Sequence, residues 1–429
     1  MLEENFVFDF MGLATQLFDL PRSISNQDLD LTFEVCSNFV PLKKKSFAIA
    51  ADSSWPDPLR WKLYSGNVSL NGEKVIDSNN NPLHVISHSA QINRTINFQE
   101  LKEHLHCNPL VPDHIPYVST YYKKDWGFAI SQTDYEKLPI DANYEVNIKS
   151  DLYKHPVEYF EYVIQGDSTK EIIFSTYYCH PNLANDNLSG LIVNLALAKW
   201  LMDYSKLNNL HFTYRFLFLP ETIGAVRYIE EHKNELKSNV VAGWILTCLG
   251  YGEEWSYLQS RYGGTLSDKV TLQVAKKEKI SLKTFSYLER GSDERQFCWP
   301  GTDLPFSSIM RSKYNNYQFY HTSGDNLSIL KEETFKESFN FYLKIVKYLE
   351  ENELYNVCSY TEPFLSDKGF YPSISDYNTR AKVKDVMNIL AYCDGTNFIS
   401  DLSRIVNLEE NYISSICSQL LVEGLICRV

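Results

Sequence analysis

The sequence predicts an α/β protein built on a mostly parallel, mixed sheet with helices on both faces. Four apolar runs without polar alternation support this, namely EIIFSTYY (171–178), FTYRFLFLP (212–220), VAGWILTCLG (241–250) and LPFSSIM (304–310). Helical segments lie between the runs, for example LIVNLALAKWLMDY (191–204). Strands that are apolar throughout are typical of a parallel sheet whose two faces are both covered.

The rest of the first 352 residues divides by pattern. Residues 5–20 and 27–40 have helical spacing of apolar side chains. Between 41 and 132, short apolar runs alternate with turn signals such as Asn71-Gly72, which is typical of a small β-rich domain. We therefore expect an α/β domain made of 1–40 and 133–352, with a β-rich domain of 41–132 inserted into it.

The C-terminal region reads as a separate unit. Residues 353–371 are the expected linker, and 372–429 give helix, helix, helix and a short strand, which indicates a winged-helix domain. From 372 to 429 there are five Lys and Arg against seven Asp and Glu, a net charge of −2. We therefore expect a protein contact or a homo-oligomer contact here, and no nucleic-acid binding.

Composition narrows the classes further. The 429-residue chain carries a formal net charge of −13, which disfavours non-specific binding to nucleic acid. No apolar run is long enough for a membrane span, and the acidic N-terminus does not resemble a signal peptide. Nine cysteines scattered singly are typical of reduced thiols, so we expect a cytoplasmic protein.

Polar side chains follow the predicted strands at one edge of the sheet. His180 and Asp186 come after the first run, Glu221 after the second and His321 after the fourth. In open α/β sheets, ligands bind at the carboxyl ends of the strands. Taken singly, each residue has a simpler explanation, because a histidine can be structural, Asp186 can cap the next helix and Glu221 can lie on the surface.

Together these residues predict a catalytic zinc site. Such sites use three protein ligands and leave a fourth position for water or substrate, which fits His180, Asp186 and His321. Glu221 would act as the general base, taking a proton from the attacking water and passing it to the leaving amine.

Further charged and aromatic residues near this edge suggest substrate contacts. Asp293, Glu294 and Asp325 are candidates to bind a substrate ammonium group. Arg311 and Arg295 are candidates to bind a carboxylate. Tyr314 is a candidate pocket residue. The alternatives are a salt-bridge network within GSDERQF (291–297) for the charged residues and core packing for the tyrosine.

Four motifs carry a resemblance to a known family: HPNLANDNLSG (180–190), PETIGAV (220–226), GSDERQF (291–297) and YHTSGDN (320–326). They resemble motifs of the aminopeptidase-like zinc peptidase superfamily, which includes leucyl aminopeptidases, glutamate carboxypeptidase and glutaminyl cyclase. From about residue 10 to 425, the chain resembles more closely a bacterial aminopeptidase-like family with an inserted β domain and a C-terminal winged helix.

The resemblance implies roles at matching positions. His180 and His321 are similar to metal histidines, Asp186 to the aspartate that bridges two metals in dinuclear members, and Glu221 to the general base. Dinuclear members have Glu-Glu where this chain has Glu221-Thr222, and an acidic ligand where it has Thr247 and Cys248. We therefore expect one Zn²⁺ per chain, with Cys248 either a ligand or a packing residue.

Three functions remain open from the sequence. The first is a zinc-dependent aminopeptidase acting on a small peptide or an aminoacylated metabolite. The second is a deacylating or glutaminyl-cyclase-like biosynthetic enzyme on the same scaffold. The third is a non-catalytic, metal-bound scaffold or regulator that acts through the winged helix, against which the intact Glu221 argues.

Overall fold

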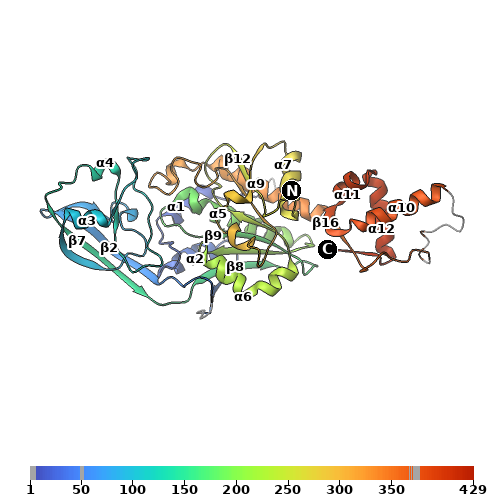
Figure 1. Cartoon of the computed structure of the whole chain (residues 1–429), viewed down its shortest axis with the longest axis horizontal. Coiled ribbons are helices and arrows are strands. Elements are labelled where there is room, and N and C mark those ends of the chain that lie inside the picture. Colours follow the sequence, from blue (N-terminus) through green and yellow to red (C-terminus); the bar gives the residue numbers. More distant parts are fainter. Residues whose placement is uncertain (1–5, 49–52, 367, 369, 371–376) are drawn as a thin grey trace.

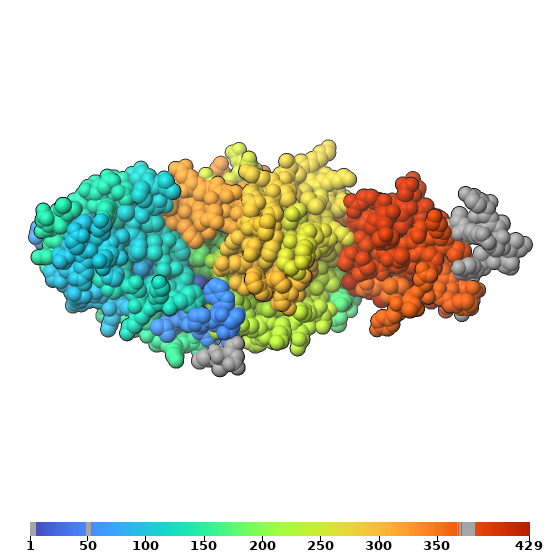
Figure 2. All heavy atoms as spheres, viewed as in Figure 1, coloured from blue at the N-terminus to red at the C-terminus, as the bar shows by residue number. Residues whose placement is uncertain are grey.

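The computed structural model describes residues 6–48, 53–366, 368, 370 and 377–429. Three units lie in a row along the longest axis of the molecule (Figures 1 and 2). A β-rich unit lies at one end, a large α/β unit in the middle and the C-terminal unit at the other end. In the part of the chain that the structure describes, no helix has the length and apolar character needed to cross a membrane.

The central unit is built on an eight-stranded mixed sheet in the order β1-β8-β10-β9-β11-β14-β12-β13. β10, β9, β11 and β14 run parallel to their neighbours within this group. β8 is antiparallel to both β1 and β10, and β12 is antiparallel to β14 but parallel to β13. The strands are β1 (Lys43–Ser46), β8 (Glu158–Ile164), β9 (Glu171–Tyr177), β10 (Thr213–Leu219), β11 (Val240–Leu246), β12 (Trp255–Leu258), β13 (Leu282–Phe285) and β14 (Phe306–Met310). The four predicted apolar runs are thus confirmed as the core strands.

Helices cover both faces of this sheet, as the sequence predicts (Figure 1). On one face α9 contacts both α5 and α7, and on the other α6 packs with α8. The helices are α1 (Phe10–Phe18), α2 (Leu29–Ser37), α5 (Gly190–Ser205), α6 (Ile223–Asn239), α7 (Leu266–Lys277), α8 (Glu294–Phe297) and α9 (Glu332–Glu351). α5 is buried along its first nine residues because it packs against the strands β9, β10 and β11 and against the helices α1 and α9.

The β-rich unit differs from its expected boundaries of 41 and 132. Its four-stranded sheet has the order β3-β2-β7-β4, and β5 pairs with β6 beside it. Its elements are β2 (Arg60–Leu70), β3 (Glu73–Asp77), β4 (Ile92–Asn97), α3 (Phe98–Glu103), β5 (Leu105–His106), β6 (Phe128–Ala129), α4 (Gln132–Tyr135) and β7 (Asn143–Tyr153). β7 lies beyond 132, and its alternating burial is typical of an antiparallel strand with one buried face. β1, in contrast, belongs to the large sheet.

The C-terminal unit also begins earlier than expected. β15 (Leu354–Val357) pairs with β16 and β17, so the segment 353–371 is not simply a linker. The other elements are α10 (Tyr377–Ala391), β16 (Asp394–Phe398), α11 (Ile399–Val406), α12 (Glu410–Val422) and β17 (Ile426–Arg428). The expected boundary at 372 lies outside the described residues. This unit has its own apolar core, centred on Ile389, Leu402 and Ile413.

Candidate active site

The three predicted metal ligands meet at the carboxyl edge of the central strands. His180 follows β9, Asp186 lies in the kinked helical turn η2 (Ala184–Ser189), and His321 lies in the loop after β14. The Nε2 atom of His321 is 3.0 Å from Asp186 Oδ2, and the Nε2 atom of His180 is 4.0 Å from the same oxygen. Among the described residues, these three form the one group of His, Cys, Asp or Glu donors that converges in this way, with all donor atoms within 4.8 Å.

This donor set fits a zinc ion. Two imidazoles and a carboxylate are ordinary zinc ligands, at about 2.0–2.2 Å from the metal. In a tetrahedral site, ligands at that distance are roughly 3.3 Å apart, which is close to the observed 3.0 and 4.0 Å separations. Burial by itself raises the pKa of Asp186, but the hydrogen bond from His321 and the charge of His180 hold it below its usual value. The carboxylate is therefore ionised and ready to bind a cation.

Asp325 holds the two metal-binding loops together. Its carboxylate accepts hydrogen bonds from the backbone N–H groups of Ala184 (3.2 Å), Asn185 (2.6 Å) and Asp186 (3.0 Å). The hydroxyl of Tyr317 donates to the same carboxylate at 2.7 Å. Asp325 is fully buried, and this burial raises its pKa to about 6. Because its oxygens are already used within the protein, Asp325 is placed as a support of the site, not as the substrate contact expected from the sequence.

The oxygen of Asp186 that does not face His321 is already engaged by a protein group. The free oxygen of Asp186, Oδ1, accepts a hydrogen bond from the Tyr177 hydroxyl, which lies 2.7 Å from Thr247 Oγ1. The backbone N–H of Thr222 donates to Asp293 Oδ1 at 2.7 Å. Cys248 is buried, and desolvation raises the pKa of its thiol well above the usual value. These contacts leave no second set of ionised ligands beside Asp186 among the described residues.

Glu221 lies beside the metal ligands. It follows Pro220 at the end of β10, and its Oε2 is 3.3 Å from His180 Nε2. Its backbone N–H points to Cys179 Sγ at 3.3 Å, which fixes the start of the loop. The side chain remains 19% exposed and faces the cavity over the site. This is the position that a base acting on a water molecule next to the metal ligands requires.

A cavity of about 290 Å³ opens directly over these residues. The β-rich segment between β1 and β7 supplies one wall and the α/β unit supplies the other. The lining residues are Ile24, Trp55, Tyr117, Ser119, Tyr121, Tyr122, His180, Glu221, Thr222, Arg295 and His321. The wall is fixed to the loop of His321, because the Tyr117 N–H donates to the His321 carbonyl at 2.8 Å and the Ser323 N–H donates to Ile115 at 2.8 Å.

The remaining expected substrate residues lie away from this cavity lining. Asp293 is fully buried beneath Thr222, and desolvation together with nearby Glu221 raises its pKa to about 8. Glu294 accepts hydrogen bonds from the Gly291 and Ser292 N–H groups, at 2.8 and 3.0 Å, and from the Tyr314 hydroxyl at 2.7 Å.

Arg311 and Tyr314 are likewise internal. Arg311 pairs with Glu337, donates to the carbonyl of Glu253 at 3.2 Å and lies 4.4 Å from the centre of the Trp255 ring. Tyr314 is only 2% exposed and packs in the apolar cluster that contains Cys248. Of the two arginines considered from the sequence, Arg295 is therefore the one that lines the cavity.

Sequence reasoning did not identify the aromatic residues of the site. Tyr117, Tyr121, Tyr122 and Trp55 come from the inserted segment, more than 50 residues before His180. Tyr177 supports Asp186 from within β9. The aromatic run YVSTYY (117–122) is the one local signal for the cavity wall, and tyrosines are too frequent in this chain to make it specific.

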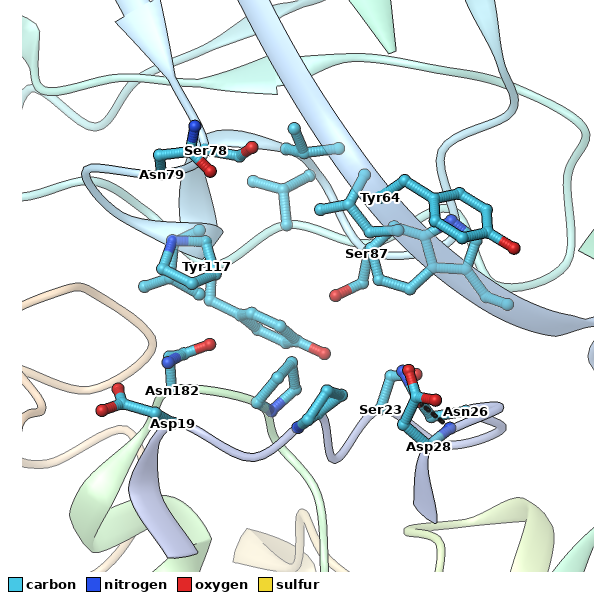
Figure 3. A pocket seen from close by; sticks show the side chains of 18 residues that line it. Asp19, Ser23, Asn26, Asp28, Tyr64, Ser78, Asn79, Ser87, Tyr117 and Asn182 are labelled. Atoms are coloured by element: carbon cyan, nitrogen blue, oxygen red, sulfur yellow. Dashed lines mark hydrogen bonds between the residues drawn. The ribbon is translucent and has the colours of Figure 1, made fainter. Parts of the chain in front are cut away.

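A second cavity, of about 210 Å³, lies between the β-rich unit and the α/β unit (Figure 3). The β-rich unit contributes apolar and aromatic residues, including Trp61, Leu63 and Tyr64, and the α/β unit contributes Asp19 and Asn182. Tyr117 lies across the middle of this cavity and also lines the cavity over the metal ligands. The inserted segment thus shapes both spaces.

Comparison with known proteins places this fold in a class. The structure superimposes on a crystal structure from Clostridium acetobutylicum that is provisionally assigned as a peptidase, with a TM-score of 0.78 and 32% identity. The superposition covers 98% of this chain and 96% of the other. It also superimposes on BSAP, a zinc aminopeptidase from Bacillus subtilis, with a TM-score of 0.58 and 12% identity, covering 80% of this chain and 96% of the other. The fold is that of the M28-type zinc aminopeptidases.

The family follows from sequence matches. Residues 11–352 match a family described as a domain of unknown function, DUF4910, and residues 352–428 match a winged helix-turn-helix family. A second Clostridium acetobutylicum match is 36% identical over 403 residues, or 92% of this chain and 90% of that protein. It is provisionally named as a polysaccharide biosynthesis protein with an aminopeptidase-like domain. The chain belongs to this aminopeptidase-like DUF4910 family, and the likenesses support a peptidase-type hydrolase.

Proposed function

We propose that the protein is a zinc-dependent hydrolase that cleaves an amide or peptide bond in a small peptide or an aminoacylated metabolite. The observation that carries the proposal is the convergence of His180, Asp186 and His321 at the sheet edge with Glu221 3.3 Å from His180. The aminopeptidase fold of the relatives supports the same reaction class.

The chain's own residues have distinct tasks in this reaction. A zinc ion held by His180, Asp186 and His321 would polarise the scissile carbonyl and make a nearby water more acidic. Glu221 receives the proton of the attacking water and delivers it to the leaving nitrogen. The tyrosines and Trp55 of the cavity wall limit the access of bulk water, which strengthens the electrostatic interactions inside. Asp325 and Tyr177 keep Asp186 in place.

Two reactions fit this description, and we favour the aminopeptidase reaction because named zinc aminopeptidases share the fold. Deacylation of an N-acylated amino acid is the second candidate. The cavity lining favours this candidate. Glu221 is the one carboxylate in the lining, so no other carboxylate is left there to pair with the ammonium group of an aminopeptidase substrate. The winged helix would serve a protein contact and not nucleic-acid binding.

A paired measurement tests the proposal. Purified protein is expected to contain about one zinc ion per chain by elemental analysis. Glu221→Gln should retain this zinc but lose hydrolysis of a peptide and acyl-amino-acid panel by roughly 10²- to 10⁴-fold, since it removes the proton-transfer group. Glu231→Gln, a half-exposed glutamate on α6, is the matched control. Hydrolysis that persists in Glu221→Gln contradicts the assigned role, and absence of bound zinc contradicts the metal.

A further inference from the structure

Arg295 presents an incompletely paired guanidinium group to the cavity. It lies in α8 and lines the cavity with Glu221 and His180. One of its terminal nitrogens, Nη2, donates to the hydroxyl of Thr222, while its Nε is buried and has no hydrogen-bond partner. Among the described residues, no carboxylate forms an ion pair with Arg295 within 4.0 Å. Because Nε is buried, the terminal nitrogens of the guanidinium are the ones that a ligand in the cavity can reach.

The acidic groups near the cavity do not offer a second charge to a substrate. The carboxylates of Asp293, Glu294 and Asp325 accept hydrogen bonds from backbone N–H groups below the surface of the site. Glu221 alone reaches the cavity as an acid. The cavity therefore has one base, two histidines and one arginine, so its unused binding capacity is for an anion.

We propose that Arg295 binds a carboxylate of the substrate, the α-carboxylate of the amino acid that leaves as the amine. A guanidinium matches a carboxylate with two parallel N–H···O hydrogen bonds. Glu221 lines the same cavity, and its carboxylate repels a dianion more than a monoanion, which favours a carboxylate over a phosphate. The substrate class is thus a dipeptide or an N-acyl amino acid, and not the N-terminus of a long peptide.

The size of the cavity agrees with a short substrate. Its volume of about 290 Å³ lies at the low end of the range of roughly 300–1,000 Å³ that is typical of small-molecule pockets. Trp55 and Tyr122 at the wall lie 6.0 Å apart, ring centre to ring centre, in an edge-to-face contact. The inference rests on the proposed hydrolase function, because it assigns the part of the substrate next to the cleaved bond.

Four matched compounds test the inference: Leu-Leu, N-acetyl-Leu-Leu and the C-terminal amide of each. Both acids should be cleaved with a kcat/KM about 10- to 100-fold above their amides, which is the contribution of a charge-assisted pair. Arg295→Met should abolish the preference, so that the ratio of kcat/KM for each acid to that for its amide falls to about 1, and Arg295→Lys should recover part of the preference. Arg261→Met, which removes an arginine that pairs with Asp303 outside the cavity, is the control and should keep the full preference.

The outcomes separate the inference from the function on which it rests. Cleavage of acids and amides at equal rates overturns the inference and leaves the hydrolase in place. If none of the four is cleaved, calorimetric titration of Glu221→Gln with N-acetyl-leucine and N-acetyl-leucinamide decides. Binding of the acid at least about tenfold tighter, lost in Glu221→Gln/Arg295→Met, supports the inference. Equal binding, no binding, or tighter binding of inorganic phosphate overturns it.

Discussion

Tyr177 determines how Asp186 can bind a metal. A carboxylate that bridges two metals uses one oxygen for each ion. In this chain, Asp186 Oδ2 faces His321 at 3.0 Å, while Oδ1 accepts the Tyr177 hydroxyl. The same hydroxyl lies 2.7 Å from Thr247 Oγ1, in the place where dinuclear relatives are expected to have an acid. One tyrosine therefore orients the carboxylate and, in the proposed zinc site, leaves one of its oxygens to bind the metal.

Tyr177→Phe is predicted to weaken zinc binding. Without the hydroxyl, Asp186 loses the partner that fixes its orientation, and the loss of such an outer partner typically reduces metal affinity about 10- to 100-fold. Competition with a chromogenic chelator measures the zinc dissociation constant. Tyr178→Phe is the control, because that tyrosine is equally buried but donates to the Glu158 carbonyl at 3.0 Å. Unchanged affinity in Tyr177→Phe would show that Asp186 needs no such support.

At the scale of elements, the sequence predicts what is encoded in local runs of residues. The strands β9, β10, β11 and β14 were identified because a strand buried on both faces is apolar along its whole length. His180 and Glu221, which follow two of these strands, lie at one edge of the sheet, with Nε2 and Oε2 3.3 Å apart. β7 lies outside the expected β-rich domain of 41–132. Its partners β2 and β4 are more than 40 residues away in the sequence, and no local pattern identifies them as partners.

A second limit of prediction from the sequence concerns which acidic residues reach the cavity. Asp293, Glu294 and Asp325 follow the same strand-end rule as Glu221, and the sequence gives them similar environments. What separates them is the backbone: each accepts N–H groups from a turn whose conformation only the folded chain defines. Arg295 and Arg311 are distinguished in the same way, since Glu337 on α9 pairs with one of them alone.

The contact between α8 and the loop after β10 is predicted to make stability depend on pH. Asp293 accepts the Thr222 N–H, and its other oxygen is buried without a partner. The pKa of Asp293 is raised from the usual 3.8 to about 8, chiefly by burial and also by the charges of Glu221 and Glu294. The Thr222 N–H and Arg295 act in the opposite direction. Between these values the folded protein retains a proton that the unfolded chain releases. Folding stability from this group is therefore present at low pH and is lost as the pH rises towards 8.

Asp293→Asn should remove this pH dependence. The amide oxygen can still accept the Thr222 N–H, but the side chain no longer ionises. Relative to the unchanged protein, the variant should gain at least about 1 kcal/mol in free energy of unfolding between pH 5 and pH 8. Urea unfolding at both pH values gives the comparison, and exposed Asp141→Asn is the control. A variant whose relative stability is the same at both pH values would contradict the raised pKa.

At the scale of the molecule, the three units have different relations to the site. The β-rich unit is part of it, because the segment that includes Tyr117 forms the cavity wall and bonds to the His321 loop. The winged-helix unit lies at the opposite end and contributes no lining residue (Figure 2). Its contact with the α/β unit is partly apolar, because Leu354, Phe398 and Val429 pack in the core of that unit, and partly polar, through Lys269 on α7.

Lys269→Met is predicted to loosen this docking and leave the site intact. The Lys269 ammonium on α7 donates to the Thr396 carbonyl at 2.7 Å and to Asn397 Oδ1 at 2.8 Å. Removing these bonds should lower the free energy of local opening of β16 by about 1 kcal/mol. Hydrogen exchange should therefore quicken roughly fivefold in β16 and remain unchanged in β9.

The control is Lys276→Met, which alters an exposed lysine on the same helix. It separates loss of the two hydrogen bonds from a general effect of removing charge from α7. Both variants should hydrolyse the same substrates at the same rate, because neither α7 nor the winged-helix unit contributes a residue to the cavity lining. Faster exchange throughout β9 in Lys269→Met would mean that the winged helix stabilises the catalytic unit. A loss of activity without faster exchange in β16 would instead connect Lys269 to the site by a route other than docking.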